Sequence, residues 1–393
     1  MRVTGTDHMG SQFDLSVVDG IWQAGSGDAT RDLSGLYVLP GLVDAHAHLS
    51  ADTLDVETFV DPRHILERAR RAATRGVLDV VDKGWNDDTV LQMVRSGRLA
   101  TPRVQAAGVM IHPHDGYWKG FGTVVDGDDL IEACAGLGRD RPWVKIVGDW
   151  PRKGRGALPN YRERVLAEAV AAAHDGGARV AIHTMAPDTP SMTVRAGVDS
   201  IEHGLFLSEA DLEALADRDG MWVPTVLRMH EVLAEMRPGS SGAEVLGQGI
   251  DNVSRLLPIA SELGVTVLAG SDLAIDVGDI GREVAALNAL GLPIEDAVAG
   301  ASYRGRSALG IPSTLEPGTP TRRPRGIRCR PGRRSADPGR AQTRHRGRRG
   351  ARRSDVSGLC AFRCGGGSRA KLPIELEQGA TVVSNEFQTV DDL

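Results

Sequence analysis

The stretch LYVLPGLVDAHAH, residues 36–48, runs from an apolar segment directly into side chains that can bind a cation. Its Val, Leu and Tyr residues favour a buried β-strand. His46 and His48 are two positions apart, so in an extended chain both imidazoles lie on the same side and can reach one metal ion. A strand that ends in a His-x-His pair therefore predicts a metal site at its carboxyl end.

Seven further segments rich in Val, Ile and Leu follow, with helix-like stretches between them. The eight expected strands cover residues 36–48, 77–83, 103–110, 143–147, 179–183, 200–203, 221–226 and 265–272. Strands that alternate with helices are typical of a parallel sheet. Eight such repeats predict an α/β fold, a (β/α)₈ barrel of the TIM type, and we expect this barrel to span residues 39–312.

The segments on either side of the expected barrel differ sharply in composition. Residues 1–38 are typical of short strands and turns that are too few to fold alone, so we expect them to be the N-terminal part of a small β domain. The rest of that domain should come from the segment after the barrel. Residues 313–393 are instead an Arg-rich segment, with fourteen arginines and one acid between residues 321 and 353, and we expect it to be disordered or poorly packed.

The composition of this tail is typical of a sequence translated in a shifted reading frame. Read one base later, the codons that can encode residues 322–331 (RRPRGIRCRP) permit ADLVAFDADP, which has the alternating pattern of the missing strand. A frame slip near Thr321 would leave the first 35 residues without the strands they should pair with. The alternative is a genuine basic tail that binds nucleic acid. Removing its thirteen net positive charges from the overall charge of −6 leaves about −19 on the rest of the chain, which argues against that alternative.

Four more ligand-type side chains lie at or near the carboxyl ends of later strands. His183, His203 and Asp272 end the fifth, sixth and eighth expected strands, where barrel enzymes keep their chemistry. Lys145 lies inside the apolar segment WVKIV, where an unpaired ammonium is costly and its pKa should fall. A neutral amine there can take up carbon dioxide as a carbamate, which is an anionic ligand. Otherwise the lysine pairs with an acid or extends to the mouth of the barrel.

The ordered series PGLVDAHAH, VKIV, VAIH, AGVDSIEHG and GSD resembles the amidohydrolase superfamily, specifically its imidazolonepropionase-like and prolidase-like metal-dependent hydrolases. The resemblance runs from about residue 13 to residue 320. It implies two divalent metal ions, the more buried one on His46, His48 and Asp272 and the more exposed one on His183 and His203. It also implies a carboxylated Lys145 that bridges them, with zinc as the ion that suits these ligands.

The reaction that the resemblance implies is hydrolysis of a carbon–nitrogen bond by a hydroxide that bridges the metals. The substrate would be an amide, a dipeptide-like molecule or a cyclic amide. Catalytic roles fall to Asp272, Lys145 and His203, and Asp272 would carry the proton to the leaving nitrogen. Three alternatives stay open: a lactonase or esterase on the same site, nucleic-acid binding through the Arg-rich tail, and a catalytically inactive barrel that metals stabilise.

Three further residues are candidates for substrate binding. Tyr161 resembles the family's substrate-contacting tyrosine, and the alternative is a packing residue. His112 and His114 lie in the polar and aromatic loop after the third expected strand, where either can contact substrate or the whole loop can be solvated.

The composition indicates where the protein works and which partners it can have. The sequence has no apolar run typical of a secretory signal and no stretch of about 18 uninterrupted apolar residues. Its four cysteines are too few and too unevenly spaced for a disulfide framework. We therefore expect a cytoplasmic enzyme that acts on a small-molecule substrate, without membrane partners and without nucleic acid as its main partner. Monomer and homo-oligomer are both compatible with the sequence.

Overall fold

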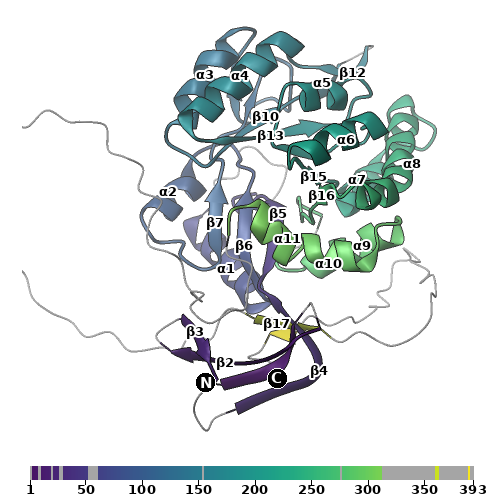
Figure 1. The fold of residues 1–393 in the computed structure, drawn as a ribbon. Helices are drawn as coiled ribbons and strands as arrows, with labels where there is room; N and C mark the ends of the chain where they lie inside the picture. Colours follow the sequence, from purple (N-terminus) through teal and green to yellow (C-terminus); the bar gives the residue numbers. More distant parts are fainter. Residues whose placement is uncertain are drawn as a thin grey trace, which may run out of the picture.

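The computed structural model describes residues 2–7, 10–18, 21–25, 30–51, 61–152, 155–274, 277–311, 359–362 and 388–389. Figure 1 shows a large body of strands and helices above a smaller sheet that holds the N-terminal strands. The two parts are joined where the chain passes from β4 (Thr30–Pro40) into β5 (Leu42–Ala47). The single strand predicted over residues 36–48 is therefore two strands in different sheets, separated by Gly41.

All eight predicted strands of the large body are present, several of them shorter than predicted. They are β5, β6 (Val77–Asp82), β7 (Arg103–Ala106), β10 (Trp143–Val147), β13 (Arg179–Thr184), β14 (Ser200–His203), β15 (Met221–Val223) and β16 (Thr266–Val267). One sheet has the order β5-β6-β7. The other has the order β16-β15-β14-β13-β10-β8-β9, with β8 at Ile111–His112 and β9 at Thr123–Val124. Among the described residues, every strand pairing in these two sheets is parallel, as the βα alternation predicts.

The two parallel sheets approach each other at two edges. At one edge the chain leaves β7 and forms β8 five residues later, and the indole N–H of Trp143 in β10 donates to Oε1 of Gln105 in β7 at 2.9 Å. At the other edge the backbone N–H of Ala45 donates to the carbonyl oxygen of Ala269 at 2.9 Å, and the N–H of Asp272 donates to that of His46 at 2.8 Å. The segment after β16 therefore runs beside β5, which brings the first and last predicted ligands together.

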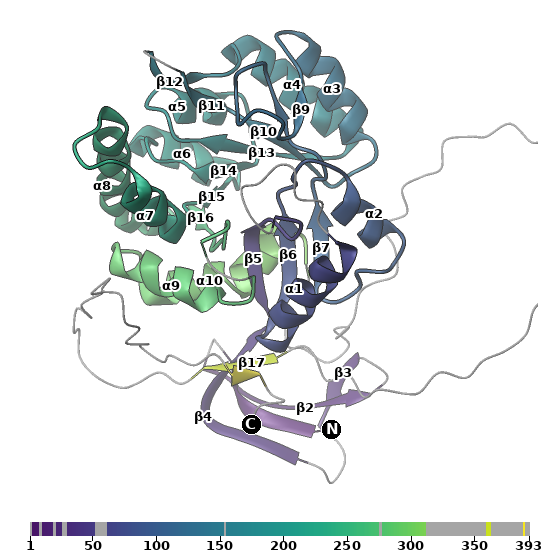
Figure 2. The same cartoon turned by 180° about the vertical axis from the view of Figure 1, so that it is seen from behind.

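Helices cover the outside of these strands, as Figures 1 and 2 show from opposite sides. They are α1 (Pro62–Thr74), α2 (Thr89–Arg95), α3 (Asp129–Gly138), α4 (Glu163–Gly176), α5 (Thr189–Arg195), α6 (Glu209–Asp217), α7 (Val226–Glu235), α8 (Ser241–Glu262), α9 (Ile280–Ala289), α10 (Ile294–Gly300) and α11 (Tyr303–Ala308). Local sequence sets several ends. Ser208 and Asp211 form a capping box at the start of α6, and Gly177 ends α4 with φ 93°.

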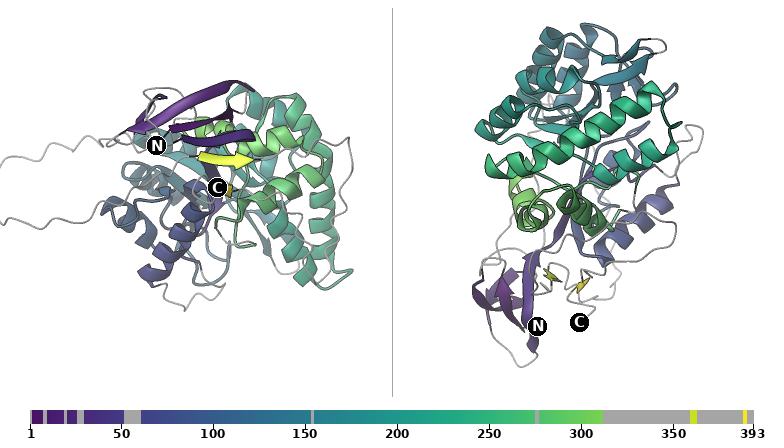
Figure 3. Two further views of the ribbon diagram at one scale, coloured as in Figure 1. Left: turned by 90° about the horizontal axis from the view of Figure 1, so that it is seen from below. Right: turned by 90° about the vertical axis from the view of Figure 1, so that its right-hand side faces the viewer.

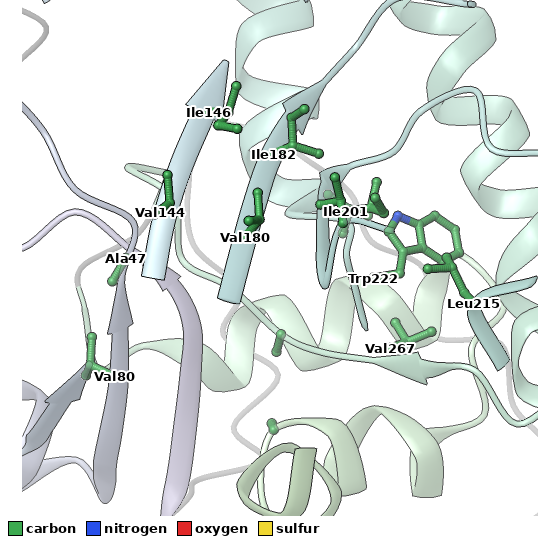
Figure 4. Close-up of a cluster of buried hydrophobic side chains, with 14 of the residues drawn as sticks. Ala47, Val80, Val144, Ile146, Val180, Ile182, Ile201, Leu215, Trp222 and Val267 are labelled. Carbon is green, nitrogen blue, oxygen red and sulfur yellow. The ribbon is translucent and has the colours of Figure 1, made fainter. Parts of the chain in front are cut away.

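The main hydrophobic core lies between the strands and the helices. Figure 4 shows Val144 and Ile146 of β10, Val180 and Ile182 of β13, and Trp222 of β15 gathered in this core. Side chains alternate along a strand, so the residues between them, such as Lys145 and Ala181, lie on the opposite face. The strands are therefore buried on both faces, and their inner face carries the polar residues that form the site.

The small sheet corrects one expectation about the tail. Its strand order is β18-β17-β4-β1-β2-β3, with β1 at Arg2–Asp7, β2 at Gln12–Val18, β3 at Ile21–Ala24, β17 at Leu359–Phe362 and β18 at Gln388–Thr389. The prediction that the tail supplies no strand is wrong, because β17 pairs antiparallel with β4 over four residues; Figure 3 shows this short strand beside the N-terminal ones. Its segment LCAF is short and apolar enough to cover a sheet edge. The segment around Thr321, where we expect the frame slip, lies outside the described residues.

Candidate metal centre

Three of the predicted ligands converge at the carboxyl ends of β5 and β16. Nε2 of His46 lies 3.2 Å from Nε2 of His48, and Oδ1 of Asp272 lies 3.4 Å from the first nitrogen and 3.3 Å from the second. All three residues are buried. Two imidazole nitrogens and a carboxylate oxygen at this spacing form a group that can hold a divalent ion.

His183 and His203 form a second pair beside this cluster. Nδ1 of His183, in β13, lies 2.9 Å from Nε2 of His203 at the end of β14. The ring centroids of His203 and His46 are 5.5 Å apart, and Oδ2 of Asp272 lies 3.9 Å from Nδ1 of His203. Asp272 therefore contacts both groups of histidines.

Lys145 is buried in β10 with 2% of its surface exposed. Its Nζ makes no hydrogen bond to any residue that the structure describes, and the same is true of Nε2 of His183. Burial lowers the pKa of Lys145 to about 8, although the carboxylates of Glu202 and Asp272 oppose this shift. A buried amine without a partner is costly. A group that the described residues do not supply would therefore stabilise this position.

The protonation states of the cluster suit a divalent cation. Burial lowers the pKa of His46 to about 4 and that of His203 to about 3, and it brings the pKa of His183 well below 6.5. Burial alone would raise the pKa of Asp272, but His46, His48 and His203 together bring it well below 3.8. Near neutral pH the imidazoles therefore keep free lone pairs and Asp272 is a carboxylate, as metal binding requires. The residues present fit a metal ion.

Each of three histidines is also held through its other ring nitrogen. Nδ1 of His46 lies 2.5 Å from Oε2 of Glu202, Nδ1 of His48 lies 2.6 Å from the carbonyl oxygen of Gly84, and Nδ1 of His203 lies 2.6 Å from Oγ1 of Thr225. Such partners fix the tautomer and the orientation of a ligating ring. Sequence reasoning missed Glu202 and Thr225. The acid immediately before His203, in an otherwise apolar strand, was a usable signal for Glu202.

Backbone geometry at the strand ends determines the direction of three side chains of the site. His203, Thr225 and Asp272 have left-handed backbones with φ of 64°, 47° and 43°. L-residues other than Asn, Asp and His rarely adopt this region, and a β-branched threonine does so at a cost. The conformation turns His203 away from the alternation of β14, so that it reaches His183. Gly270 is needed nearby, because a Cβ there would lie 2.6 Å from Cβ of His46.

Five aromatic side chains gather next to the histidines. They are Trp85, Tyr117, Trp118, Phe121 and Trp150. The ring of Trp85 lies 5.1 Å from that of His48, and the rings of Tyr117 and Trp150 each lie 6.1 Å from that of His183. The chain has only six Trp, four Tyr and six Phe, so almost a third of its aromatic residues lie in this aromatic cluster. That concentration points to a role beyond general packing.

The three predicted substrate contacts are placed differently from the six ligands. Tyr161 is buried before α4, and its hydroxyl donates to the carbonyl oxygen of Val125 at 2.9 Å. Both ring nitrogens of His112 contact carbonyl oxygens, those of Pro113 and Phe121, and its ring lies 5.9 Å from Tyr117. The side chain of His114 is 76% exposed beside Asp115. The structure thus brings together the six predicted ligands, while Tyr161 contacts the loop after β9 and His112 and His114 contact residues of their own loop.

Comparisons with known proteins bear on this arrangement. The model of the amidohydrolase family matches residues 154–320. An uncharacterised protein of Mycobacterium tuberculosis is 30% identical over 318 residues, which cover 76% of this chain and 82% of that protein. A 5-methylthioadenosine/S-adenosylhomocysteine deaminase of Halobacterium salinarum is 28% identical over 76% of this chain and 75% of its own length. The chain belongs to the amidohydrolase superfamily.

Solved structures agree with this assignment at the level of the fold. An Xaa-Pro dipeptidase with methionine bound in its active site superposes with a TM-score of 0.69 over 93% of this chain and 94% of its own, at 20% identity. Members of this superfamily are hydrolases that act on carbon–nitrogen bonds of small molecules, usually with divalent metals, and this chain is such a hydrolase. Among the described residues, no helix is long and apolar enough to cross a membrane.

Proposed function

We propose that this chain hydrolyses the carbon–nitrogen bond of an amide or dipeptide-like substrate with two divalent metal ions. One observation carries the proposal: the ligand atoms of His46, His48 and Asp272 converge beside a buried Lys145 whose amine has no partner among the described residues. The first three would hold the more buried ion, and His183 and His203 the more exposed one. Zinc suits this set of imidazole and carboxylate ligands.

Lys145 would join the two sites as a carbamate. A pKa of about 8 leaves part of the amine neutral near neutral pH, and only the neutral amine reacts with carbon dioxide. The product is an anion with two oxygens, which replaces a costly buried cation with a ligand. When bound, the metal ions would acidify a water molecule and polarise the substrate carbonyl.

Asp272 is the residue best placed to move a proton. It lies between the two groups of histidines and is held as a carboxylate by them. We propose that it accepts a proton from the attacking water and delivers it to the leaving nitrogen. Lys145 and His203 complete the proposed catalytic set by holding the reacting groups in place.

The aromatic cluster supports a substrate with an apolar or aromatic group close to the scissile bond. Tyr117 and Trp150 stand beside His183, and Trp118 adds a side chain that is 37% exposed. Aromatic faces of this kind bind flat or apolar groups of a ligand. Tyr161, His112 and His114 remain proposed substrate contacts, which would require a substrate that reaches their loops.

The fold that carries this site is proposed to be a closed (β/α)₈ barrel. The hydrogen bonds between the segment after β16 and β5 support closure at one edge, and the hydrogen bond between Trp143 of β10 and Gln105 of β7 supports it at the other. In such a barrel five of the six proposed ligands lie at or after the carboxyl ends of the strands, and Lys145 lies within β10 and faces inward.

The decisive experiment compares metal-loaded and metal-free protein on a substrate panel. N-acyl amino acids, dipeptides, cyclic amides and matched esters and lactones would be tested after loading with zinc, manganese or cobalt. We expect close to two ions per chain, loss of activity with chelators, and preference for amides over esters. Asp272→Asn should remove most of the turnover, whereas Arg255→Ala, on the surface of α8, should change nothing. Full amide turnover by fully metal-free protein, or one ion per chain at full activity, would refute the proposal.

A further inference from the structure

Two buried residues, Lys83 and Glu202, form a chain of polar contacts that ends at the proposed metal ligand His46. Nζ of Lys83 lies 2.8 Å from Oε1 of Glu202, and Oε2 of the same carboxylate lies 2.5 Å from Nδ1 of His46. The side chains of Lys83, Glu202 and His46 are 1%, 0% and 2% exposed. The hydroxyl of Ser200 donates to Oε1 at 2.6 Å. Both oxygens of Glu202 are thus engaged, one by a cation and one by a proposed metal ligand.

Stability alone is a weak explanation for this buried charge pair. Removing two charges from water costs several kcal/mol per ion, and buried ion pairs can often be replaced by apolar residues of similar size without loss of stability. Lys83 also lies 4.5 Å from the ring centroid of Trp143, so its surroundings would accept an apolar side chain. The burial of Lys83 and Glu202 therefore needs a reason other than stability.

The geometry of Lys83 and Glu202 provides this reason, because the contact with Glu202 determines which nitrogen of His46 is free to bind a metal ion. With Nδ1 held by the carboxylate, the lone pair of Nε2 faces His48 and Asp272. Carboxylates that hold the outer nitrogen of a ligating histidine fix its tautomer and its ring orientation. Lys83 holds the opposite oxygen and so fixes the carboxylate itself.

The turn that carries Lys83 also holds the second histidine. Gly84 follows Lys83 directly, and its carbonyl oxygen lies 2.6 Å from Nδ1 of His48. Gly84 has φ 85°, and a Cβ there would lie 2.0 Å from the carbonyl oxygen of Gly108, so only glycine fits this turn. Two consecutive residues after β6 thus orient both members of the His-x-His pair, one through Glu202 and one directly.

We propose that Lys83 and Glu202 are positioning residues that set the affinity of the buried metal site formed by His46, His48 and Asp272. Lys83 anchors the carboxylate of Glu202, and the carboxylate anchors His46. This role rests on the proposed metal site, and it makes no claim about the substrate.

The test compares Lys83→Met and Glu202→Gln with a matched control at the other end of β6. Arg103 forms an ion pair with the buried carboxylate of Asp79 and is not a contact of any proposed ligand. Arg103→Met therefore removes a cation from a buried carboxylate without touching the site. For each protein we would measure zinc affinity by competition with graded chelators, the visible spectrum of the cobalt-loaded form, and the thermal midpoint of the metal-free form.

We expect the zinc affinity of the tighter site to fall by about 10- to 100-fold in Lys83→Met and in Glu202→Gln. The cobalt spectrum should change in both, whereas Arg103→Met should keep the affinity and spectrum of the parent. Lys83→Arg, which retains a cation, should recover part of the loss. If Lys83→Met does not fold, Glu202→Gln decides the matter, because it retains the volume of the side chain.

Unchanged zinc affinity and cobalt spectrum in Glu202→Gln would overturn the positioning role, even if the thermal midpoint fell as in the control. This outcome differs from a failure of the proposed function. A parent protein that binds no metal would refute the metal site itself, whereas a parent that binds metal with variants that bind it equally well would refute only the positioning role.

Discussion

His203 and Thr225 are joined by a 2.6 Å contact between Nδ1 of the imidazole and Oγ1 of the hydroxyl, and both residues have left-handed backbones. The hydroxyl of Thr225 donates to the carbonyl oxygen of Pro224 at 2.8 Å, so toward His203 it accepts. Nδ1 of His203 therefore carries the proton, and its Nε2, 2.9 Å from His183, keeps a lone pair. Two adjacent strand ends in an uncommon conformation thus fix the tautomer of one proposed ligand.

We predict that Thr225→Val weakens the more exposed metal site and that Thr225→Ser does not. Valine has nearly the same shape but cannot accept the proton of His203, whereas serine can. Metal content after dialysis should fall from two ions toward one in Thr225→Val and stay near two in Thr225→Ser. Equal metal content in both variants would show that the hydroxyl does not position His203.

Lys145→Ala should lower amide turnover by orders of magnitude, because it removes the proposed bridge between the two metal sites. Short carboxylic acids such as acetate or propionate should restore part of the activity by occupying the position of the carbamate. The measurement is turnover against acid concentration, with Lys145→Met as the control, whose side chain fills the space and should prevent rescue. Normal activity and metal content in Lys145→Ala would exclude the carbamate.

The convergence of the six proposed ligands could be predicted from the sequence because each lies at a strand end or within a strand whose pattern is local. His46 and His183, for example, follow runs of apolar residues, and parallel strands bring such ends together. The contacts of Lys83 and Glu202 could not be predicted in this way. They join residues 119 positions apart, and although Glu202 belongs to the motif AGVDSIEHG, Lys83 belongs to none, so their proximity emerges only when β6 and β14 take their places around His46.

Local patterns could be predicted and contacts between distant segments could not in the rest of the molecule as well. The aromatic cluster comes from two loops and from β11 (Asp149–Arg152), which carries Trp150, so no single stretch of sequence predicts it. β15 and β16 are shorter than predicted: they end at Val223 and Val267, and the segments that follow them contain the left-handed residues Thr225 and Asp272. Strain at a functional strand end overrides the local preference for β structure.

Glu283, which is not itself a proposed ligand, predicts a pH dependence of stability. It is fully buried in α9 and accepts hydrogen bonds from the backbone N–H groups of Val226 and Leu227 at 2.7 and 3.1 Å. Burial raises its pKa from 4.5 to about 8. A raised pKa means that the folded state binds the proton more tightly, so this contribution to stability is full below about pH 4.5 and is lost as the pH rises toward 8.

We therefore expect the urea midpoint of the metal-free parent protein to fall as the pH rises from 5 to 8. The midpoint of metal-free Glu283→Gln should fall by less over the same range. The amide does not ionise, so the variant should show a flatter profile in this range. The slope that one such group can contribute is at most about 1.4 kcal/mol per pH unit. Parallel profiles for the two proteins would mean that the carboxyl of Glu283 ionises normally in the folded chain.

The aromatic cluster predicts a specificity that mutation can shift. Trp150→Ala should lower kcat/KM for N-acyl substrates with an aromatic group by about tenfold, which corresponds to one lost aromatic contact. Substrates with a small acyl group should change much less. The measurement is the ratio of the two kcat/KM values, with Trp22→Ala in the N-terminal sheet as a control for loss of a tryptophan. An unchanged ratio in Trp150→Ala would place the substrate elsewhere.

The last prediction concerns the frame slip that we propose near Thr321. β4 extends over eleven residues, Thr30–Pro40, yet β17 pairs with only the last four of them. A restored frame would supply the alternating segment ADLVAFDADP, long enough to pair with more of the small sheet and to cover its apolar face. All six proposed ligands precede residue 273, so the repair should raise the thermal midpoint, protease resistance and soluble yield without changing which substrates are cleaved. Sequencing the coding DNA across codons 315–360 and comparing the two proteins tests this directly. If the given chain is already protease-resistant and the restored chain is no more stable, the basic tail is genuine and the short pairing of β17 with β4 is its native contact.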